Sequence, residues 1–397
     1  MPVPSTSTRL LVWTLALLST VSYGTLYYAQ PLLAIAAEHA LGWSRVQTSL
    51  AFTLALLVTA FVAPAVGRAL DARGGRTLLT GGALLGALAL LTLALASSYP
   101  LFVTGWLLAG GAMSLTFYES VFTVVGQQTQ GAARTRATLT ITLIAGLAST
   151  IFVPLTSALL EGGGLRQALV ILAALLLGVA GLTWRVLPDY GMGTPGGKRP
   201  PFTPDARLIR LTLAFTLARL VTVGTGLQLA PLLLAAGYAP ALAASLTGLA
   251  GLAALPGRAL FVPLLSRLGA PPLTVFLFAQ LALSTLLLHF TGSHATVVTG
   301  IIAFGLASGA LTLARAELLA QHYLPQAFGA ANGWMARPVN LAQALTPLGV
   351  GLLFTWTGGY SLSLLLMTAL GCAAALTLLG AARGGFHTTA VETRGGD

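Results

Sequence analysis

The sequence predicts an all-α membrane protein with twelve transmembrane helices in two pseudo-symmetric six-helix bundles. Of its 397 residues, 56% are hydrophobic and only 7% are charged, whereas a soluble chain carries about 25% charged residues. Apolar runs of about 20 residues recur along the whole length, and a helix of that length crosses the hydrocarbon core of a bilayer. These runs do not alternate polar and apolar residues, so transmembrane β-strands are excluded.

Polar segments divide the apolar runs into two sets of six predicted helices. The first set spans 9–33, 46–67, 77–97, 101–126, 136–160 and 166–187, and the second spans 208–234, 241–266, 271–291, 295–320, 330–355 and 359–382. Between the sets lies a polar, Gly- and Pro-rich segment, Asp189 to Asp205, which reads as a linker. The predicted domains are a bundle over 1–188, a linker over 189–207 and a second bundle over 208–397. The run after Arg9 is too long for a signal-peptide core, so the first helix is expected to be retained.

The placement of the basic residues predicts the orientation of the chain. The net charge is +11, but the Lys and Arg residues stand in short loops between apolar runs, so we expect a lipid bilayer and no nucleic acid as partner. With a cytoplasmic N-terminus, 14 of the 20 fall on the cytoplasmic side, including Lys198, Arg199 and Arg394, and two, Arg45 and Arg166, fall outside. The positive-inside rule then places both termini and the linker in the cytoplasm of a bacterial-type cell, around its inner membrane.

Short sequence matches recur between the two halves in the same order. The matched pairs, 190 to 200 residues apart, are Gly24-Thr25 with Gly224-Thr225, Gly67 to Leu70 with Gly257 to Leu260, and Glu119 with Glu317. Each match alone is weak in a chain so rich in Ala, Gly and Leu. Together they indicate a duplication, and two related bundles around a midplane site are what alternating access requires.

A loop motif follows the second predicted helix and consists of Gly67, Asp71, Arg73, Gly74 and Arg76. Gly67 permits close helix approach, and Gly74 permits a turn with positive φ. Asp71 can cap a helix end and pair with Arg73 or Arg76, a gating contact that breaks when two bundles rock. The alternative is a basic cytoplasmic loop with incidental glycines. The motif resembles the loop 2–3 signature of the major facilitator superfamily, although Ala72 stands where a basic residue is usual.

This resemblance implies a monomeric secondary active transporter, a symporter or antiporter that works by alternating access and uses no cofactor. Arg134 and Arg136, together with Arg258 eleven residues before Gly269, look like the monocarboxylate and oxalate/formate branch, which favours a carboxylate anion as solute. Ala254 stands where that branch has an acid. The alternative function is proton-driven efflux of drugs or other amphiphilic compounds.

Other function classes find no support in the sequence. The single cysteine, Cys372, and five scattered His residues make no metal-ligand spacing, so no metal is expected. The sequence shows no cluster of catalytic His, Cys or acidic residues, and no phosphate-binding loop that would use ATP. We therefore predict that the protein is not an enzyme.

Two acids are expected inside the membrane, where an ionisable group calls for a reason. Glu119 and Glu317 are the candidates for proton coupling; the alternative for each is a permanent salt bridge to an Arg that braces the cytoplasmic gate. Arg315 lies two residues from Glu317, about 200° around the helix, so the two cannot both face a cavity. Arg315 and Arg337 are predicted to belong to a helix charge network.

Two arginines are candidates for binding an anionic group, because a guanidinium offers a planar fork of donors to a carboxylate. These are Arg219 and Arg258; the alternative for Arg258 is a gate residue that snorkels to the interface. Asn340 and Gln343 form a polar stripe with Arg337 that faces either the cavity or the helix at 295–320.

An aromatic and polar face is predicted on the first helix. Tyr23, Tyr27 and Gln30 recur at i, i+4 and i+7, so they share one side of an α-helix and are candidates for contacting the solute. The alternative is an aromatic packing seam near the outer interface, where Tyr is enriched in membrane proteins.

Overall fold

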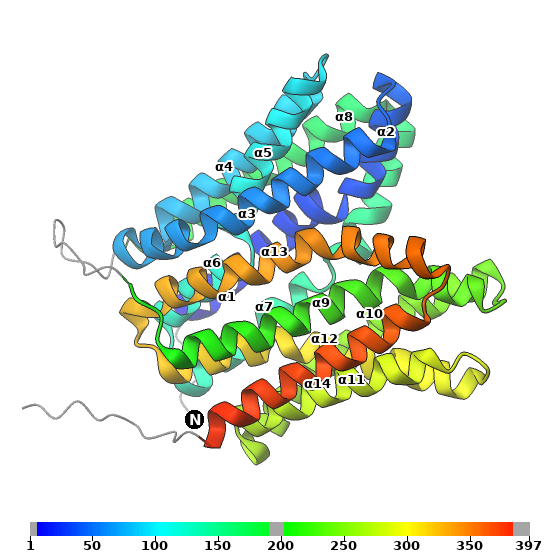
Figure 1. Ribbon diagram of the computed structural model, residues 1–397. Coiled ribbons are helices and arrows are strands. Elements are labelled where there is room, and N and C mark those ends of the chain that lie inside the picture. Colours follow the sequence, from blue (N-terminus) through cyan, green and yellow to red (C-terminus); the bar gives the residue numbers. More distant parts are fainter. Residues whose placement is uncertain (1–5, 190–201, 384–397) are drawn as a thin grey trace, which may run out of the picture.

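Long apolar helices make up most of the structure, a computed structural model that describes residues 6–189 and 202–383 (Figure 1). The helices of the first half are α1 (Thr6–Tyr23), η1 (Gly24–Tyr28), α2 (Gln30–Leu41), α3 (Arg45–Arg73), α4 (Gly75–Ala94), α5 (Tyr99–Thr116), α6 (Tyr118–Gln128), α7 (Gly131–Ala145) and α8 (Ala148–Val186). Those of the second half are α9 (Ala206–Ala235), α10 (Pro240–Leu268), α11 (Ala270–His289), α12 (His294–His322), α13 (Pro325–Thr357) and α14 (Ser361–Arg383). The predicted all-α membrane fold is confirmed.

The described helices account for twelve crossings of a bilayer. Eleven helical stretches are long and apolar enough to span, and one of them, Gly131–Val186, has 56 residues. At 1.5 Å per residue that stretch measures about 84 Å, more than twice the hydrocarbon thickness of about 30 Å. Gly164, with φ 70° and ψ −175°, interrupts it and divides it into the crossings predicted at 136–160 and 166–187.

Each half of the chain has its own hydrophobic core. The first runs from Leu11 to Leu187 and contains the buried Trp106; the second runs from Leu208 to Leu378 and contains Phe278. Large apolar side chains also cover the outside, Trp13 and Leu252 among them. Such a surface suits a lipid environment. Lipid tails offer no hydrogen bonds, so the backbone N–H and C=O groups of each helix must bond to one another.

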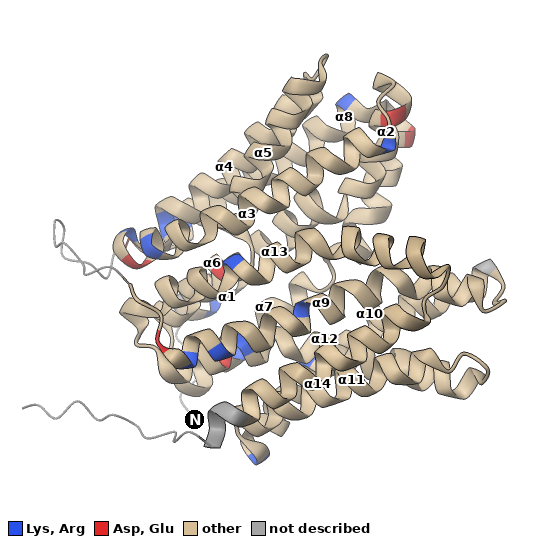
Figure 2. Cartoon of the chain, in the orientation of Figure 1, with Lys and Arg blue, Asp and Glu red and all other residues tan. Residues whose placement is uncertain are grey.

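The two halves converge at one end of the molecule and diverge at the other (Figure 1). The converging end, here called the linker end, is where α8 ends at Val186 and α9 begins at Ala206. Most of the predicted linker, residues 190–201 with Lys198 and Arg199, lies outside the described residues, as does Arg394. Figure 2 shows more basic residues along the chain at the linker end than at the opposite end.

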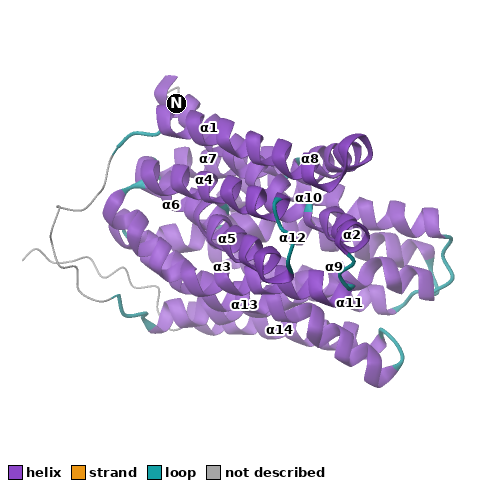
Figure 3. Cartoon of the chain, turned by 90° about the horizontal axis from the view of Figure 1, so that it is seen from above, coloured by secondary structure: helices purple, strands orange, loops and turns teal. Residues whose placement is uncertain are grey.

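Helices α3 and α13 form the closest contact between the halves, and they run side by side in Figures 1 and 3. A Cβ atom on Gly67 would lie 2.0 Å from the carbonyl oxygen of Gly329, and one on Gly333 would lie 2.5 Å from that of Ala63. The helices therefore touch through backbone atoms, which only glycine permits.

Asp71 fastens this contact at the end of α3. The side chain is buried and accepts hydrogen bonds from the backbone N–H groups of Gly329, at 3.0 Å, and Ala330, at 2.7 Å. The carboxylate thus meets the N-terminal part of α13, where the helix dipole favours negative charge. Gly74, with φ 78°, ends α3 directly after Arg73.

Arg76, the last residue of the loop motif, has partners within its own half. Its Nε donates to the carbonyl of Trp184 at 2.9 Å, its guanidinium lies over the Trp184 ring, and its Nη1 is 3.8 Å from Asp189. Arg76 therefore ties α4 to the end of α8, while Asp71 reaches across to the other half.

Candidate functional site

A cavity of about 490 Å³ lies between the two halves, a volume typical of small-ligand sites. Its walls come from α1, η1, α3, α6, α9, α10, α12 and α13. Among the described residues that line it, one carboxylate, Glu119, faces three guanidinium groups, those of Arg219, Arg258 and Arg315. The cavity is therefore polar at defined points and carries more positive than negative groups.

A π-helical turn shapes one wall of the cavity. Within η1, the N–H of Ala29 bonds to the carbonyl of Gly24 five residues earlier, at 2.9 Å. The extra residue in this turn shifts the helix face that follows it. Tyr23, Tyr27 and also Tyr28 line the cavity.

Gln30 is the exception among the three residues predicted on this face, because it lies outside the cavity lining. The predicted spacing assumed 3.6 residues per turn throughout, and the π-helical turn breaks that register before Gln30 is reached. Tyr28 lies on the cavity wall instead. Its residue type alone did not indicate that it would face the cavity.

Aromatic rings form an apolar face beside the polar groups. Tyr23 stacks on Phe117 with ring centroids 3.8 Å apart, and Tyr118 stacks on Phe122 at 5.1 Å. Phe117 has extended backbone dihedrals, φ −80° and ψ 178°, and separates α5 from α6. This break inside the predicted helix 101–126 brings Phe117, Tyr118 and Glu119 together on the cavity wall.

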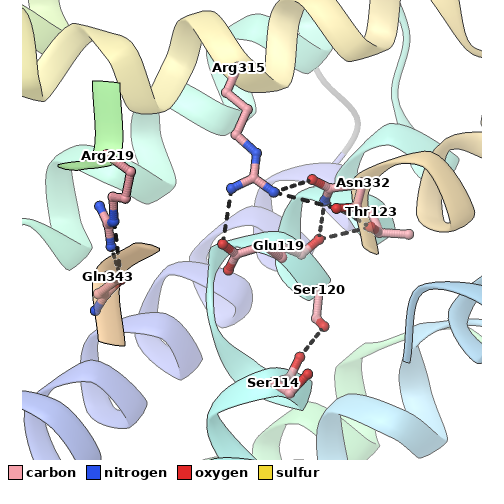
Figure 4. Close-up of polar contacts among 8 residues, drawn as sticks. All are labelled: Ser114, Glu119, Ser120, Thr123, Arg219, Arg315, Asn332 and Gln343. Carbon is pink, nitrogen blue, oxygen red and sulfur yellow. Dashed lines mark hydrogen bonds and ion pairs between the residues drawn. The ribbon is translucent and has the colours of Figure 1, made fainter. Parts of the chain in front are cut away.

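Glu119 forms an ion pair with Arg315 of the other half, with Oε1 3.2 Å from Nη1 (Figure 4). Asn332 of α13 joins both partners: its Oδ1 accepts from Arg315 Nη2 at 3.0 Å, and its Nδ2 donates to the Glu119 backbone carbonyl at 2.8 Å. The side chains of Arg315 and Glu119 are 14% and 25% exposed. A partly buried charge pair therefore links α6, α12 and α13 at the base of the cavity.

Glu317 has a different environment from its repeat partner. It lies outside the main cavity lining and accepts hydrogen bonds from the Thr135 hydroxyl, at 3.0 Å, and from Gln321, at 3.1 Å. Thr135 belongs to α7, so this contact also joins the two halves. Arg315 pairs with Glu119, 196 residues away in the sequence, rather than with the nearby Glu317.

Arg258 reaches from α10 to a break between α7 and α8. Its Nη1 donates to the carbonyl of Thr142 at 2.7 Å, and a Cβ on Gly146 would lie 2.0 Å from that nitrogen. Gly146 thus leaves the space that the guanidinium fills. The buried Nε has no hydrogen-bond partner among the described residues. Arg258 is at once a cavity residue and a contact between the halves.

Arg219, Gln343 and Tyr27 form a chain of hydrogen bonds across the cavity. Arg219 Nε donates to Gln343 Oε1 at 3.1 Å, with Nη2 on the same oxygen, and Gln343 Nε2 donates to the Tyr27 hydroxyl at 3.2 Å. Asn340 also lines the cavity. Arg337 does not; its guanidinium lies over the Phe61 ring, 5.0 Å from the centroid, so it stands apart from the Arg315 network.

Asn332 and the Thr142 carbonyl are functional groups that the sequence did not reveal. Asn332 is a polar residue whose immediate neighbours in α13 are small or apolar, which is a detectable signal. A backbone carbonyl that serves as an acceptor carries no such signal.

Two helical halves around a polar cavity in an apolar shell define a membrane transporter. The family model of the Major Facilitator Superfamily matches residues 13–284, and the chain belongs to this superfamily. The protein is accordingly a multi-pass secondary transporter of a small solute and not an enzyme. A comparison with curated protein sequences finds no match.

Solved structures with the same fold include three transporters of this superfamily. The human organic anion transporter MFSD10 (TETRAN) is 16% identical, with 95% of this chain and 100% of that chain covered and a TM-score of 0.78. The proton:xylose symporter XylE is 13% identical, with 95% and 96% covered and a TM-score of 0.79. FucP, in its outward conformation, is 13% identical, with 95% and 98% covered and a TM-score of 0.79. At these identities the likeness establishes the fold.

Proposed function

We propose that the protein is a proton-coupled secondary transporter of a small organic anion, with a carboxylate as the group recognised. The excess of guanidinium groups in the cavity carries this proposal. Glu119 pairs with Arg315, whereas Arg219 and Arg258 bond to a neutral amide and a backbone carbonyl. Two cationic groups therefore remain available to an anion, which binds them by charge-assisted hydrogen bonds. The fold shared with an organic anion transporter is in keeping with this cargo.

The orientation belongs to the same proposal. The bias of basic residues supports a cytoplasmic linker end and cytoplasmic termini in a cell inner membrane. In this proposal the contacts of Asp71, Glu119 and Arg258 lie on the cytoplasmic side of the cavity, and they support an outward-facing state. Two bundles, 1–188 and 208–397, joined by the linker 189–207, rock around the central cavity within one chain, and a monomer is the functional unit.

Glu119 is the proposed proton carrier. A proton on its carboxylate removes the ion pair with Arg315, one of the contacts that hold the cytoplasmic end closed. Protonation from the outside thereby favours opening to the inside, where the proton leaves and the pair can form again when the halves return. Asp71 and its bonds to α13 act as a second latch that must open in the same step.

Transport into proteoliposomes tests this function. We expect a pH gradient to drive uptake of labelled lactate, formate or oxalate by the wild-type protein and not by the Glu119→Gln variant. Glu161→Gln is the matched control, because this acid is exposed and is bonded to Ser157 of its own helix rather than to the other half. Persistence of gradient-driven uptake in Glu119→Gln, with normal expression, contradicts the coupling role.

The aromatic face favours a second candidate function, efflux of drugs or other amphiphilic compounds. The stacked Tyr23 and Phe117 rings offer a flat apolar surface to such molecules. Competition in the same liposomes separates the two functions, since carboxylates displace an anionic cargo and ethidium displaces an amphiphilic one. The three cavity arginines disfavour cations.

A further inference from the structure

We propose that Arg219, Gln343 and Tyr27 form a polarised hydrogen-bond relay that presents the Tyr27 hydroxyl to the solute as a donor. The inference rests on the proposed function and deepens it, because it names the group that recognises the carboxylate of the solute. All three side chains line the cavity. Tyr27 comes from η1 in the first half, whereas Arg219 and Gln343 come from α9 and α13 in the second.

The direction of the relay follows from the chemistry of its members. A guanidinium has N–H donors and no acceptor, so the Gln343 atom that two of its nitrogens contact must be the amide oxygen. Figure 4 shows this pair. The amide NH₂ then faces Tyr27 and donates to the phenolic oxygen, at 3.2 Å. No other orientation of the Gln343 amide satisfies Arg219.

The Tyr27 hydroxyl is thereby left with its own proton to donate. No described residue accepts a hydrogen bond from it, and the side chain lines the cavity. Each bond in such a chain polarises the next, so the charge of Arg219 strengthens the O–H as a donor at the far end. A solute gains this contact where it offers an acceptor, and a carboxylate oxygen is a stronger acceptor than a neutral carbonyl.

Selectivity is the expected consequence. An anionic solute completes the relay, whereas a group of similar shape that brings an N–H donor to this point leaves two donors facing each other. A site that demands an acceptor in this way discriminates more sharply than a purely apolar pocket. Tyr27 is therefore a specificity-determining residue, and Gln343 is a positioning residue that fixes its polarity.

Two variants of similar volume test the relay in the purified full-length protein. Tyr27→Phe removes the hydroxyl and keeps the ring beside Tyr28 and Phe52. Gln343→Glu replaces the NH₂ by an oxygen, so the Tyr27 O–H turns to the new carboxylate and no longer faces the solute. The control is Tyr238→Phe, which removes the hydroxyl of a tyrosine that lies outside the cavity lining.

The readout is calorimetric affinity for lactate and benzoate, each compared with its neutral primary amide. We expect tighter binding of the acids by wild type, and a loss of about tenfold or more in that preference for both relay variants. The double variant should lose no more than Gln343→Glu alone, because that change already turns the Tyr27 donor away from the solute and its added negative charge is present in both proteins. Tyr238→Phe should keep the preference.

The outcomes separate the relay from the function on which it rests. Wild-type protein that binds neither acid overturns both proposals. Acids that bind wild type and Tyr27→Phe with the same preference overturn the relay and leave anion transport standing. Additive losses in the double variant also overturn the relay, because they show that Tyr27 and Gln343 act separately.

Discussion

At the scale of single residues, Arg258 holds a backbone carbonyl of the opposite half while it lines the cavity. Gly146→Ala tests this contact, because the new Cβ would lie 2.0 Å from Nη1, and the flexible guanidinium is what must move. A lost hydrogen bond from a charged donor costs about 1.5–3 kcal/mol, which predicts a shift of about tenfold or more toward the state open at the linker end. Spin-label distances across that end measure the shift.

Gly178→Ala is the control for this substitution, since nothing lies within 4 Å of the Cβ position at Gly178. An unchanged distance distribution in Gly146→Ala, with Arg258 still present, means that the Thr142 contact does not bias the conformation.

Most of the candidate binding and coupling residues singled out from the sequence line the cavity, but their partners were not predictable. Tyr23, Tyr27, Glu119, Arg219, Arg258, Asn340 and Gln343 all line the cavity. Their residue types sufficed, since polar groups inside apolar helices are few and demand a reason. Pairing is different: Glu119 and Arg315 are 196 residues apart, and one sequence holds no information on such distances.

At the scale of helices, the α3–α13 contact depends on the absence of side chains. Gly67→Ala places a Cβ 2.0 Å from the Gly329 carbonyl oxygen, a backbone atom that can move only with its helix. We expect a lower melting temperature and reduced transport, because the linker end no longer closes fully.

Gly81→Ala in α4 is the matched control, because nothing lies within 4 Å of its Cβ position. Alanine exceeds glycine in helix propensity by about 1 kcal/mol, so this variant should be as stable as wild type or more so. Equal melting temperatures and transport rates in the two variants contradict the close-packing role of Gly67.

Helix positions were predictable from hydropathy, and the interruptions within helices were not. The predicted helix 9–33 continues through η1 and α2 to Leu41, and the predicted helix 101–126 breaks at Phe117. Neither Tyr28 nor Phe117 is a helix-breaking residue type. Pro31, which has no N–H to donate, follows the π-helical turn at the start of α2, whereas no residue type marks the break at Phe117. The Gly164 interruption fell where polar punctuation already marked an end.

At the scale of the whole molecule, an outward-facing state predicts which surfaces water reaches. In a Cys372→Ser background, Thr222→Cys lies on the cavity wall and Thr123→Cys lies buried beside Glu119. We expect a membrane-impermeant maleimide to label position 222 from outside in intact cells and to leave position 123 unlabelled. Labelling of position 123 alone, or of position 222 only from the cytoplasm, contradicts the proposed orientation or state.

The architecture as a whole was predictable because the lipid solvent imposes it. Charged residues are so rare in this chain, at 7%, that apolar spans and the polar segment between them stand out without ambiguity. The relative tilt of the halves was not predictable, since each half has its own hydrophobic core and hydropathy along the chain carries no information on the angle between them.

The backbone-to-backbone seam between α3 and α13 has a thermodynamic consequence. Glycine-lined surfaces present little hydrocarbon, so water that enters the seam as it opens hydrates mainly peptide groups. Polar hydration lowers the heat capacity and apolar hydration raises it. Parting the seam at Gly67, Gly329 and Gly333 therefore adds no large positive change in heat capacity. The contribution of these glycines to the balance between the two states is then nearly linear in temperature.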